Sequence, residues 1–345
     1  MDRRTVVFFV VTSVAFGGTF VGAKAGLAHV PPLALLAFRF DVAAFVLGGY
    51  TVWRFSSTAL RPQTRDDVIG ILATGLVTIG ATNALIFVGQ QYVTSGVASI
   101  IASLNPILTP VFAAALVSDE RLTRRGAVGM GLGLGGVALV VSPDPANLLG
   151  GSVLGKAVLL AAATTGALGS VLVRWTDGDL SSTVRTAWGL PLAAVFAHLL
   201  SAGTGESVAN VTWTPTAVAA VTYLGVVAGG VAYVTYFDLI DTTGVIHANL
   251  VFYVVPVVAS IGGWTLLGES ISGSAIAGFL VIFGGFAVIG SETLDYPGLV
   301  RSTVDTEPHH VCRQGDSHGG PEYPAADSGT VADRHDEDAT ISGGD

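Results

Sequence analysis

Charged side chains stand inside long apolar stretches of this sequence, and Arg39 is the most conspicuous of them. It lies about seven residues into one such stretch, and Asp41 follows two residues later, so a helix would place the two on different faces. A guanidinium at such a depth can contact a bound molecule or ion. It can also form a structural pair with a carboxylate or with helix-end carbonyls. The sequence leaves both roles of Arg39 open.

Amide and aromatic side chains in other apolar stretches could complete a site around Arg39, because amides hydrogen-bond and aromatic rings provide apolar walls. Lys24, at the end of the first stretch, is a further candidate contact. Trp264 fits an interfacial position equally well. The candidate binding residues are therefore Lys24, Arg39, Asn83, Asn105, Tyr233, Tyr236, Asn249, Tyr253 and Trp264.

The composition places these residues in a membrane protein. Half of the chain is hydrophobic (51%) and 12% is charged, and from Thr5 to Gly290 the regular polar faces of soluble helices are missing. No arrangement typical of nucleophilic catalysis, phosphate binding or metal ligation occurs in a suitable setting. The sequence therefore predicts no catalytic residue, cofactor or metal, and no nucleic-acid partner. The expected partners are the lipid bilayer and a small molecule.

Two halves of the chain share a pattern of proline, acid and glycine. Pro106 precedes Glu120, which is followed by glycines at nine, fifteen and sixteen residues; Pro256 and Glu269 are followed by glycines at the same offsets. The match predicts a duplicated unit. A proline within a spanning helix loosens its hydrogen bonds, and each acid could cap a helix or carry a proton. We therefore assign coupling or gating to Asp41, Pro106, Glu120, Pro256 and Glu269.

The apolar stretches predict an all-α integral membrane protein with ten transmembrane helices, five in residues 5–141 and five in residues 153–290. The expected spans are 5–23, 32–53, 68–90, 95–117, 127–141, 153–173, 183–200, 216–240, 245–267 and 274–290. Arginines gather in alternate connections, which predicts that both termini are cytoplasmic. Five is an odd number, so the second repeat should be inverted relative to the first.

The C-terminal segment differs from the rest of the chain. Residues 1–291 contain 13 acids and 13 bases, whereas residues 292–345 contain 12 acids and 3 arginines, so the net charge of −9 arises there. The segment has almost no apolar run. We expect residues 291–345 to form an acidic, disordered cytoplasmic tail.

With these residues in place, the sequence resembles the EamA family of the drug/metabolite transporter superfamily. FGGTFVGAK (16–24) is similar to the family's W-G-x-x-F-x-x-x-K opening, with Phe16 in place of tryptophan, and AFRF (37–40) resembles its second-span R-F. The two Pro-to-Glu-to-Gly stretches resemble its hallmark in both repeats. The resemblance implies a ten-span bundle around a central cavity that opens alternately to each side of the membrane.

Together these patterns predict a permease of the cell membrane that moves a small organic metabolite, an amino acid or a related compound, by alternating access, and not an enzyme. A multidrug or lipophilic-cation exporter is one alternative. A non-transporting sensor or scaffold that acts through the tail is another. Protons and sodium are both open as coupling ions, and the sequence does not indicate an oligomeric state.

Overall fold

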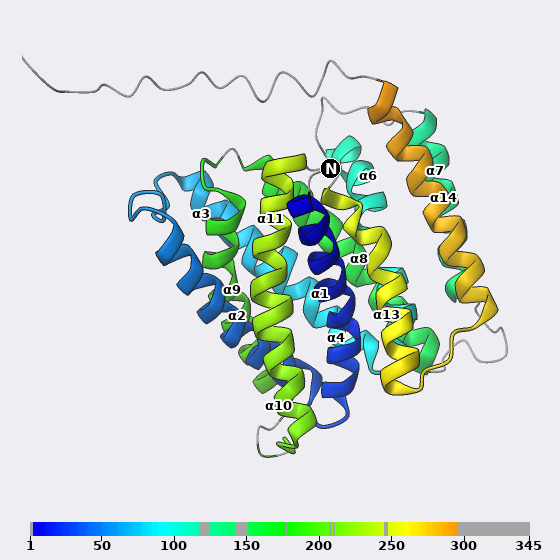
Figure 1. Cartoon of the computed structure of the whole chain (residues 1–345), viewed down its shortest axis with the longest axis horizontal. Coiled ribbons are helices and arrows are strands. Elements are labelled where there is room, and N and C mark those ends of the chain that lie inside the picture. The colour runs from blue at the N-terminus through cyan, green and yellow to red at the C-terminus, as the bar shows by residue number, and fades with distance from the viewer. Residues whose placement is uncertain are drawn as a thin grey trace, which may run out of the picture. The chain divides into compact units, whose positions relative to one another are not determined.

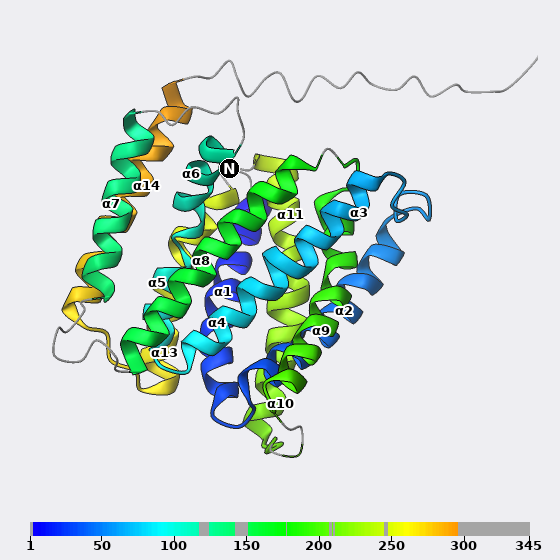
Figure 2. The ribbon, with the colours of Figure 1, turned by 180° about the vertical axis from the view of Figure 1, so that it is seen from behind.

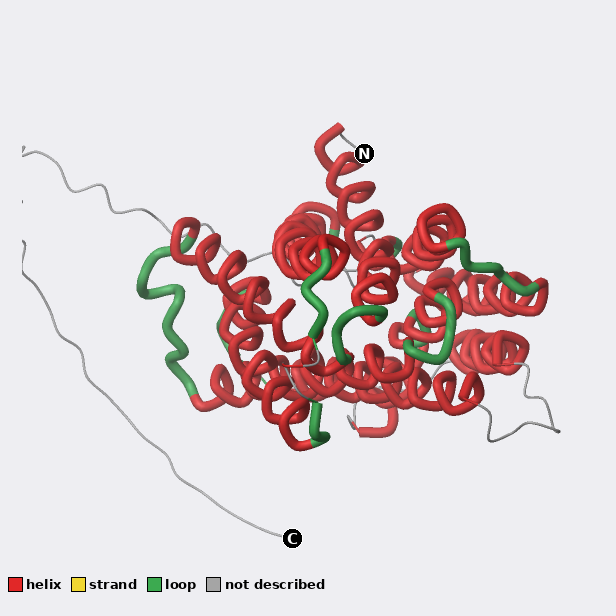
Figure 3. The backbone as a smooth tube through the Cα atoms, turned by 90° about the horizontal axis from the view of Figure 1, so that it is seen from below, coloured by secondary structure: helices red, strands yellow, loops and turns green. Residues whose placement is uncertain are grey.

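The structure is a computed structural model, and it describes residues 3–116, 124–141, 151–176, 178–206, 209, 211–244 and 248–295. Every regular element among these residues is a helix, as the sequence predicts (Figure 3). They belong to one compact unit, Met1–Pro297. The predicted tail lies outside the described residues.

Among the described residues, six helical segments are long and apolar enough to cross a membrane. They are α1 (Arg3–Leu27), α2 (Pro32–Arg54), the segment Arg65–Gln90, α8 (Gly151–Trp175), α9 (Ser182–Gly203) and the segment Pro215–Thr243. Further apolar helices accompany them: α5 (Ser95–Ala102), α6 (Asn105–Leu116), α7 (Arg124–Val141), α13 (Val251–Leu267) and α14 (Gly273–Asp295). Large apolar side chains such as Phe45, 88% exposed, cover the outside of the unit. This is the surface of a multi-pass membrane protein, because lipid solvates apolar side chains.

Two long segments change from α-helix to π-helix in the middle. The first consists of α3 (Arg65–Leu72), η1 (Ala73–Ala81) and α4 (Thr82–Gln90), and the second of α10 (Pro215–Thr222), η4 (Tyr223–Val231) and α11 (Ala232–Thr243). Each π-helical stretch is nine residues long, whereas π-helices are usually single-turn bulges that often mark functional sites. The two stretches begin 150 residues apart in the sequence.

Glycines let both π-helical stretches approach their neighbours closely. A Cβ atom on Gly75 of η1 would lie 2.7 Å from the carbonyl oxygen of Gly189 in α9. Likewise, a Cβ atom on Gly225 of η4 would come within 3.1 Å of the carbonyl oxygen of Arg39 in α2. Small residues at both crossings therefore bring backbone against backbone, which suits helix packing in lipid.

Packing in one half of the unit has a counterpart in the other. α1 packs on α13 and α11, while α8 packs on α6 and α4; α2 packs on η4, while α9 packs on η1. The pairs α2–α9 and α7–α14 lie side by side, and both views of the ribbon show the α7–α14 pair at one edge (Figures 1 and 2). Each of these packing pairs therefore has a counterpart when the helices of residues 3–141 exchange roles with those of residues 151–295.

The two prolines of the shared pattern occupy different local settings. Pro106 stands in the first turn of α6, after a turn at Ser103–Leu104 that separates α5 from α6. Proline is tolerated there because the first N–H groups of a helix have no intrahelical partner. Pro256 lies inside α13, as predicted, and is buried. The chain in the first half is therefore interrupted just before its proline instead of being kinked by it.

Candidate functional site

Arg39 lies in the interior of the unit. Its side chain is 4% exposed, and Nη2 donates a hydrogen bond to Oδ1 of Asn83 at 3.2 Å. The guanidinium carbon also lies 4.8 Å from the ring centroid of Phe40 and 5.0 Å from that of Phe87, within the range of cation–π contacts. Nε and Nη1 are buried and have no hydrogen-bond partner. Arg39 is thus a buried cation with unused donors.

Asn83 is held in position from both sides of its amide. Its Nδ2 donates to the carbonyl oxygen of Ile79 in η1 at 2.8 Å, which orients Oδ1 toward Arg39. Tyr233 of α11 packs against the apolar cluster that contains Phe40 and Phe87. The structure therefore brings together three of the predicted binding residues, from the first and second halves of the chain.

An aromatic cluster continues from Tyr233. The ring of Phe16 in α1 lies 5.6 Å from Tyr233 and 5.8 Å from Tyr236, and 6.0 Å from Phe252 of α13. Tyr236 donates from Oη to Oδ1 of Asn249 at 2.6 Å. Two more predicted binding residues, Tyr236 and Asn249, therefore join this group. Phe16 and Phe252 are not among the predicted site residues; for Phe16, its place at the family's tryptophan position could have indicated the contact.

Lys24 binds the end of another helix. Its Nζ donates to the carbonyl oxygens of Gln90, Gln91 and Val93 at 3.0, 3.2 and 2.8 Å. These groups lie at the C-terminus of α4, which is where a helix attracts a cation. In this conformation the ammonium group is occupied by main-chain acceptors and lies apart from the Arg39 group.

Glu269 binds the N-terminus of a helix, whereas Lys24 binds a C-terminus. Its carboxylate accepts hydrogen bonds from the backbone N–H of Ser95 at 2.9 and 3.1 Å and from Oγ of Ser95 at 3.3 Å, at the start of α5. A carboxylate suits the N-terminus of a helix. Lys24 and Glu269 therefore join α1 and the α13–α14 connection to the junction of α4 and α5. Glu120, the acid at the matching position in the first half of the chain, lies outside the described residues.

The remaining predicted residues lie elsewhere. Asp41 forms a 2.9 Å pair with His198 of α9, and both side chains are about half exposed. Asn105 receives a hydrogen bond from Thr109 Oγ1 at its carbonyl oxygen. The ring of Tyr253 lies 5.3 Å from that of Phe283. Trp264 is 66% exposed on α13, the orientation that the interfacial alternative anticipates.

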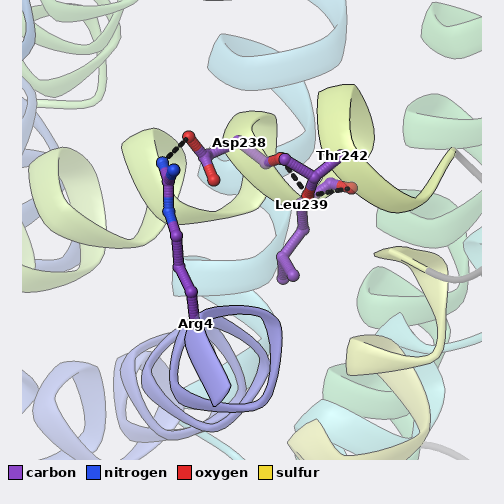
Figure 4. A network of polar contacts seen from close by, with 4 residues as sticks. All are labelled: Arg4, Asp238, Leu239 and Thr242. Atoms are coloured by element: carbon purple, nitrogen blue, oxygen red, sulfur yellow. Dashed lines mark hydrogen bonds and ion pairs between the residues drawn. The ribbon is translucent and has the colours of Figure 1, made fainter. Parts of the chain in front are cut away.

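An ion pair joins α1 and α11 at the N-terminal end of α1. Arg4 Nη2 lies 2.8 Å from Asp238 Oδ1, and Thr242 donates to the carbonyl oxygens of Asp238 and Leu239 (Figure 4). Deeper between the same two helices, Oγ1 of Thr12 donates to Oγ1 of Thr235 at 2.7 Å. Polar contacts therefore join α1 and α11 at two places: at the N-terminal end of α1 and in the buried part of the interface.

The described residues contain no group of three or more His, Cys, Asp or Glu that could hold a metal ion. Two hollows open on the outside of the unit and are lined almost wholly by apolar side chains: one over α10 and η4, beside Trp213 and Tyr223, and one between α13 and α14, beside Pro256. Neither hollow contains Arg39 or Asn83. The buried cation Arg39 therefore lies apart from both hollows.

Comparison with known protein families identifies the family of this chain. Residues 3–142 and 153–291 match the EamA-like transporter family. The chain belongs to this family. Its two matched segments coincide with the halves whose helices exchange contacts, so the Arg39–Asn83 pair comes from one family unit and Tyr233, Tyr236 and Asn249 from the other.

Relatives agree with this assignment. An uncharacterized transporter of Archaeoglobus fulgidus is 22% identical over 82% of this chain and 98% of its own length. The uncharacterized transporter YoaV of Bacillus subtilis is 24% identical over 81% of this chain and 94% of its own length. A probable amino-acid metabolite efflux pump of Escherichia coli is 27% identical, over 84% and 95%. The family and these relatives are transporters and not enzymes.

A solved crystal structure shares the fold. It superposes with a TM-score of 0.58 at 22% identity and covers 84% of this chain and 97% of its own length.

Proposed function

We propose that this chain is a permease that carries a small organic metabolite, an amino acid or a related compound, across the cell membrane. The observation that carries the proposal is the buried polar and aromatic group where the two family units meet. Arg39 and Asn83 come from the first unit, and Tyr233, Tyr236 and Asn249 from the second. Polar residues that are buried between repeats within apolar helices mark substrate pathways in secondary transporters.

The proposed mechanism is alternating access by ten spans arranged as two inverted five-span repeats. Support comes from the contacts that persist when the halves exchange roles, and from the π-helical stretches 150 residues apart. Arginines in alternate connections favour cytoplasmic termini. Lys24 and Glu269 at one end of α1 and the Arg4–Asp238 pair at the other then act as gates, each closing a different side.

The relative from Escherichia coli named as an amino-acid metabolite efflux pump supports an amino-acid-like solute. A lipophilic-cation exporter fits the interior less well, because Arg39 is a buried cation that forms no ion pair with any described residue. Like charges in a medium of low polarity repel strongly.

The test is flux of labelled amino acids and other small metabolites into proteoliposomes that contain the purified protein. Each solute is measured without an ion gradient, with a pH gradient and with a sodium gradient, and protein-free liposomes give the background. Flux above background for at least one solute is expected, and the gradient that drives it identifies the coupling ion. Background flux for every solute would refute the proposal.

Deleting residues 298–345 separates a permease from a sensor that acts through its tail. A permease keeps its flux because the compact unit Met1–Pro297 is intact. A chain whose purpose is signalling shows no flux either with or without the tail.

A further inference from the structure

The guanidinium of Arg39 lacks a counter-charge. It is 4% exposed and forms no ion pair with any described residue, and its Nη2 donates a hydrogen bond to the neutral amide of Asn83. Removing a charge from water costs several kcal/mol even after relaxation of the protein. Cation–π contacts to the rings of Phe40 and Phe87 offset only part of this cost.

The carboxylates that could have compensated this charge are engaged at other places. Each accepts a hydrogen bond or forms an ion pair at a helix end, in a connection or on an outer face: Asp41, Asp67, Glu206, Asp238 and Glu269. The protein therefore retains an arginine in its interior whose natural partner, an anion, does not come from the described chain.

We propose that Nε and Nη1 of Arg39 bind the carboxylate of the transported solute, so that the substrates are organic carboxylates. This inference rests on the proposed permease function and narrows it. A guanidinium presents its N–H groups in a planar fork that matches a carboxylate, and charge-assisted pairs of this kind are about twice as strong as neutral hydrogen bonds. Cations that carry no carboxylate, such as simple amines, polyamines and quaternary ammonium compounds, should be excluded as substrates by the same charge.

Two neighbours define the rest of the subsite. Oδ1 of Asn83 accepts a hydrogen bond from Nη2 of Arg39, and Nδ2 of Asn83 donates to the carbonyl oxygen of Ile79. These two bonds restrict rotation of the guanidinium. The ring of Phe16 lies 5.6 Å from Tyr233 and 5.8 Å from Tyr236, so an aromatic wall extends from Tyr233 to Tyr236. A solute whose carboxylate contacts Arg39 would extend its side chain along this apolar wall.

The decisive variant is Asn83→Asp, which places a carboxylate on the guanidinium itself. The internal ion pair should stabilise the protein toward thermal unfolding in detergent and compete with the solute. The expected loss of flux is about tenfold or more, where each factor of ten corresponds to about 1.4 kcal/mol of binding. If Arg39 served structure alone, Asn83→Asp would raise stability and leave flux unchanged, and that result would overturn the proposal.

Solute pairs that differ in the carboxylate test the chemistry directly. Proteoliposome exchange is measured for phenylalanine against phenethylamine and for alanine against ethylamine, in the wild type, Arg39→Lys and Arg39→Gln. The wild type should exchange the acids and not the amines, Arg39→Lys should retain part of the acid flux, and Arg39→Gln should lose it. Arg185→Gln is the matched control, because Arg185 is a partly buried arginine of α9 that contacts Ser182 and lies outside this group.

The remaining outcomes separate the two proposals. Equal exchange of acids and amines, or exchange of amines without exchange of organic acids, overturns the carboxylate subsite while the permease stands. If no solute moves at all, the permease proposal fails. Thermal stabilisation of the purified protein by phenylalanine, but not by phenethylamine, still tests the subsite in that case, and its absence in the wild type rejects the subsite.

Discussion

The close crossing of η1 and α9 makes a quantitative prediction about Gly75. A methyl group at this position would lie 2.7 Å from the carbonyl oxygen of Gly189, 3.0 Å from its Cα and 3.1 Å from Cβ of Leu192. Two of these atoms belong to the backbone and cannot rotate away, so the helices must separate. Overpacking of this kind costs about 1 to 3 kcal/mol, whereas replacing glycine by alanine in a helix returns about 0.5 to 1 kcal/mol. Gly75→Ala should therefore destabilise the protein by up to about 2.5 kcal/mol, with a central value of about 1 kcal/mol.

Gly48 of α2 provides the matched control. A Cβ atom built on Gly48 meets no atom within 4 Å, so Gly48→Ala brings the gain in helix propensity without a clash. The two variants add the same methyl group, and their unfolding free energies should differ by about 2 kcal/mol. Both are measured by denaturant titration of the purified protein in one detergent. Equal stabilities of Gly75→Ala and Gly48→Ala would refute the backbone contact at the η1–α9 crossing.

Three further contacts give predictions of their own. Glu269→Ala should destabilise the protein by about 1 kcal/mol or more because the N–H of Ser95 loses its acceptor, and Glu269→Gln, which keeps an acceptor oxygen, should cost less; denaturant titration that ranks them in the reverse order would contradict the capping role. For the Arg4–Asp238 pair, whose side chains are 64% and 31% exposed, a double-mutant cycle with Arg4→Gln and Asp238→Asn should give a coupling below about 1 kcal/mol, and a larger value would contradict a weak surface ion pair. Thr64→Ala removes the side chain that caps α3 within a capping box and should lower the unfolding free energy by about 1 kcal/mol, while Thr64→Ser should be nearly neutral.

The sequence predicts the helical class and the membrane location well, because long apolar runs have few other folds available to them. It also identifies Arg39, Asn83, Tyr233 and Tyr236 as costly polar groups in apolar helices. That Arg39 meets Asn83 is a property of packing between helices, and no spacing along one helix encodes it. The candidate site was therefore predictable as a set of residues but not as an arrangement.

Other features leave no trace in the apolar pattern. The acceptors of Lys24 are main-chain carbonyls, which every residue carries, so its contacts with Gln90 and Val93 could not be anticipated from residue types. A π-helical stretch is as apolar as the α-helix around it. A turn at Ser103–Leu104 precedes Pro106, where the sequence predicts one continuous span with loosened hydrogen bonds. The residue type of a proline does not show whether it stands at the start of a helix or inside one.

The position of η1 directly before Asn83 ties helical register to recognition. In an α-helix one residue occupies about 100° of rotation, so a segment that gains or loses one residue's worth of winding turns everything beyond it by about that angle. The amide of Asn83 is anchored to Ile79 inside η1, and with the present winding it reaches Arg39. If the stretch 73–81 rewound to α-helical pitch, it would swing Asn83 off the guanidinium and leave that cation with no hydrogen-bond acceptor of its own.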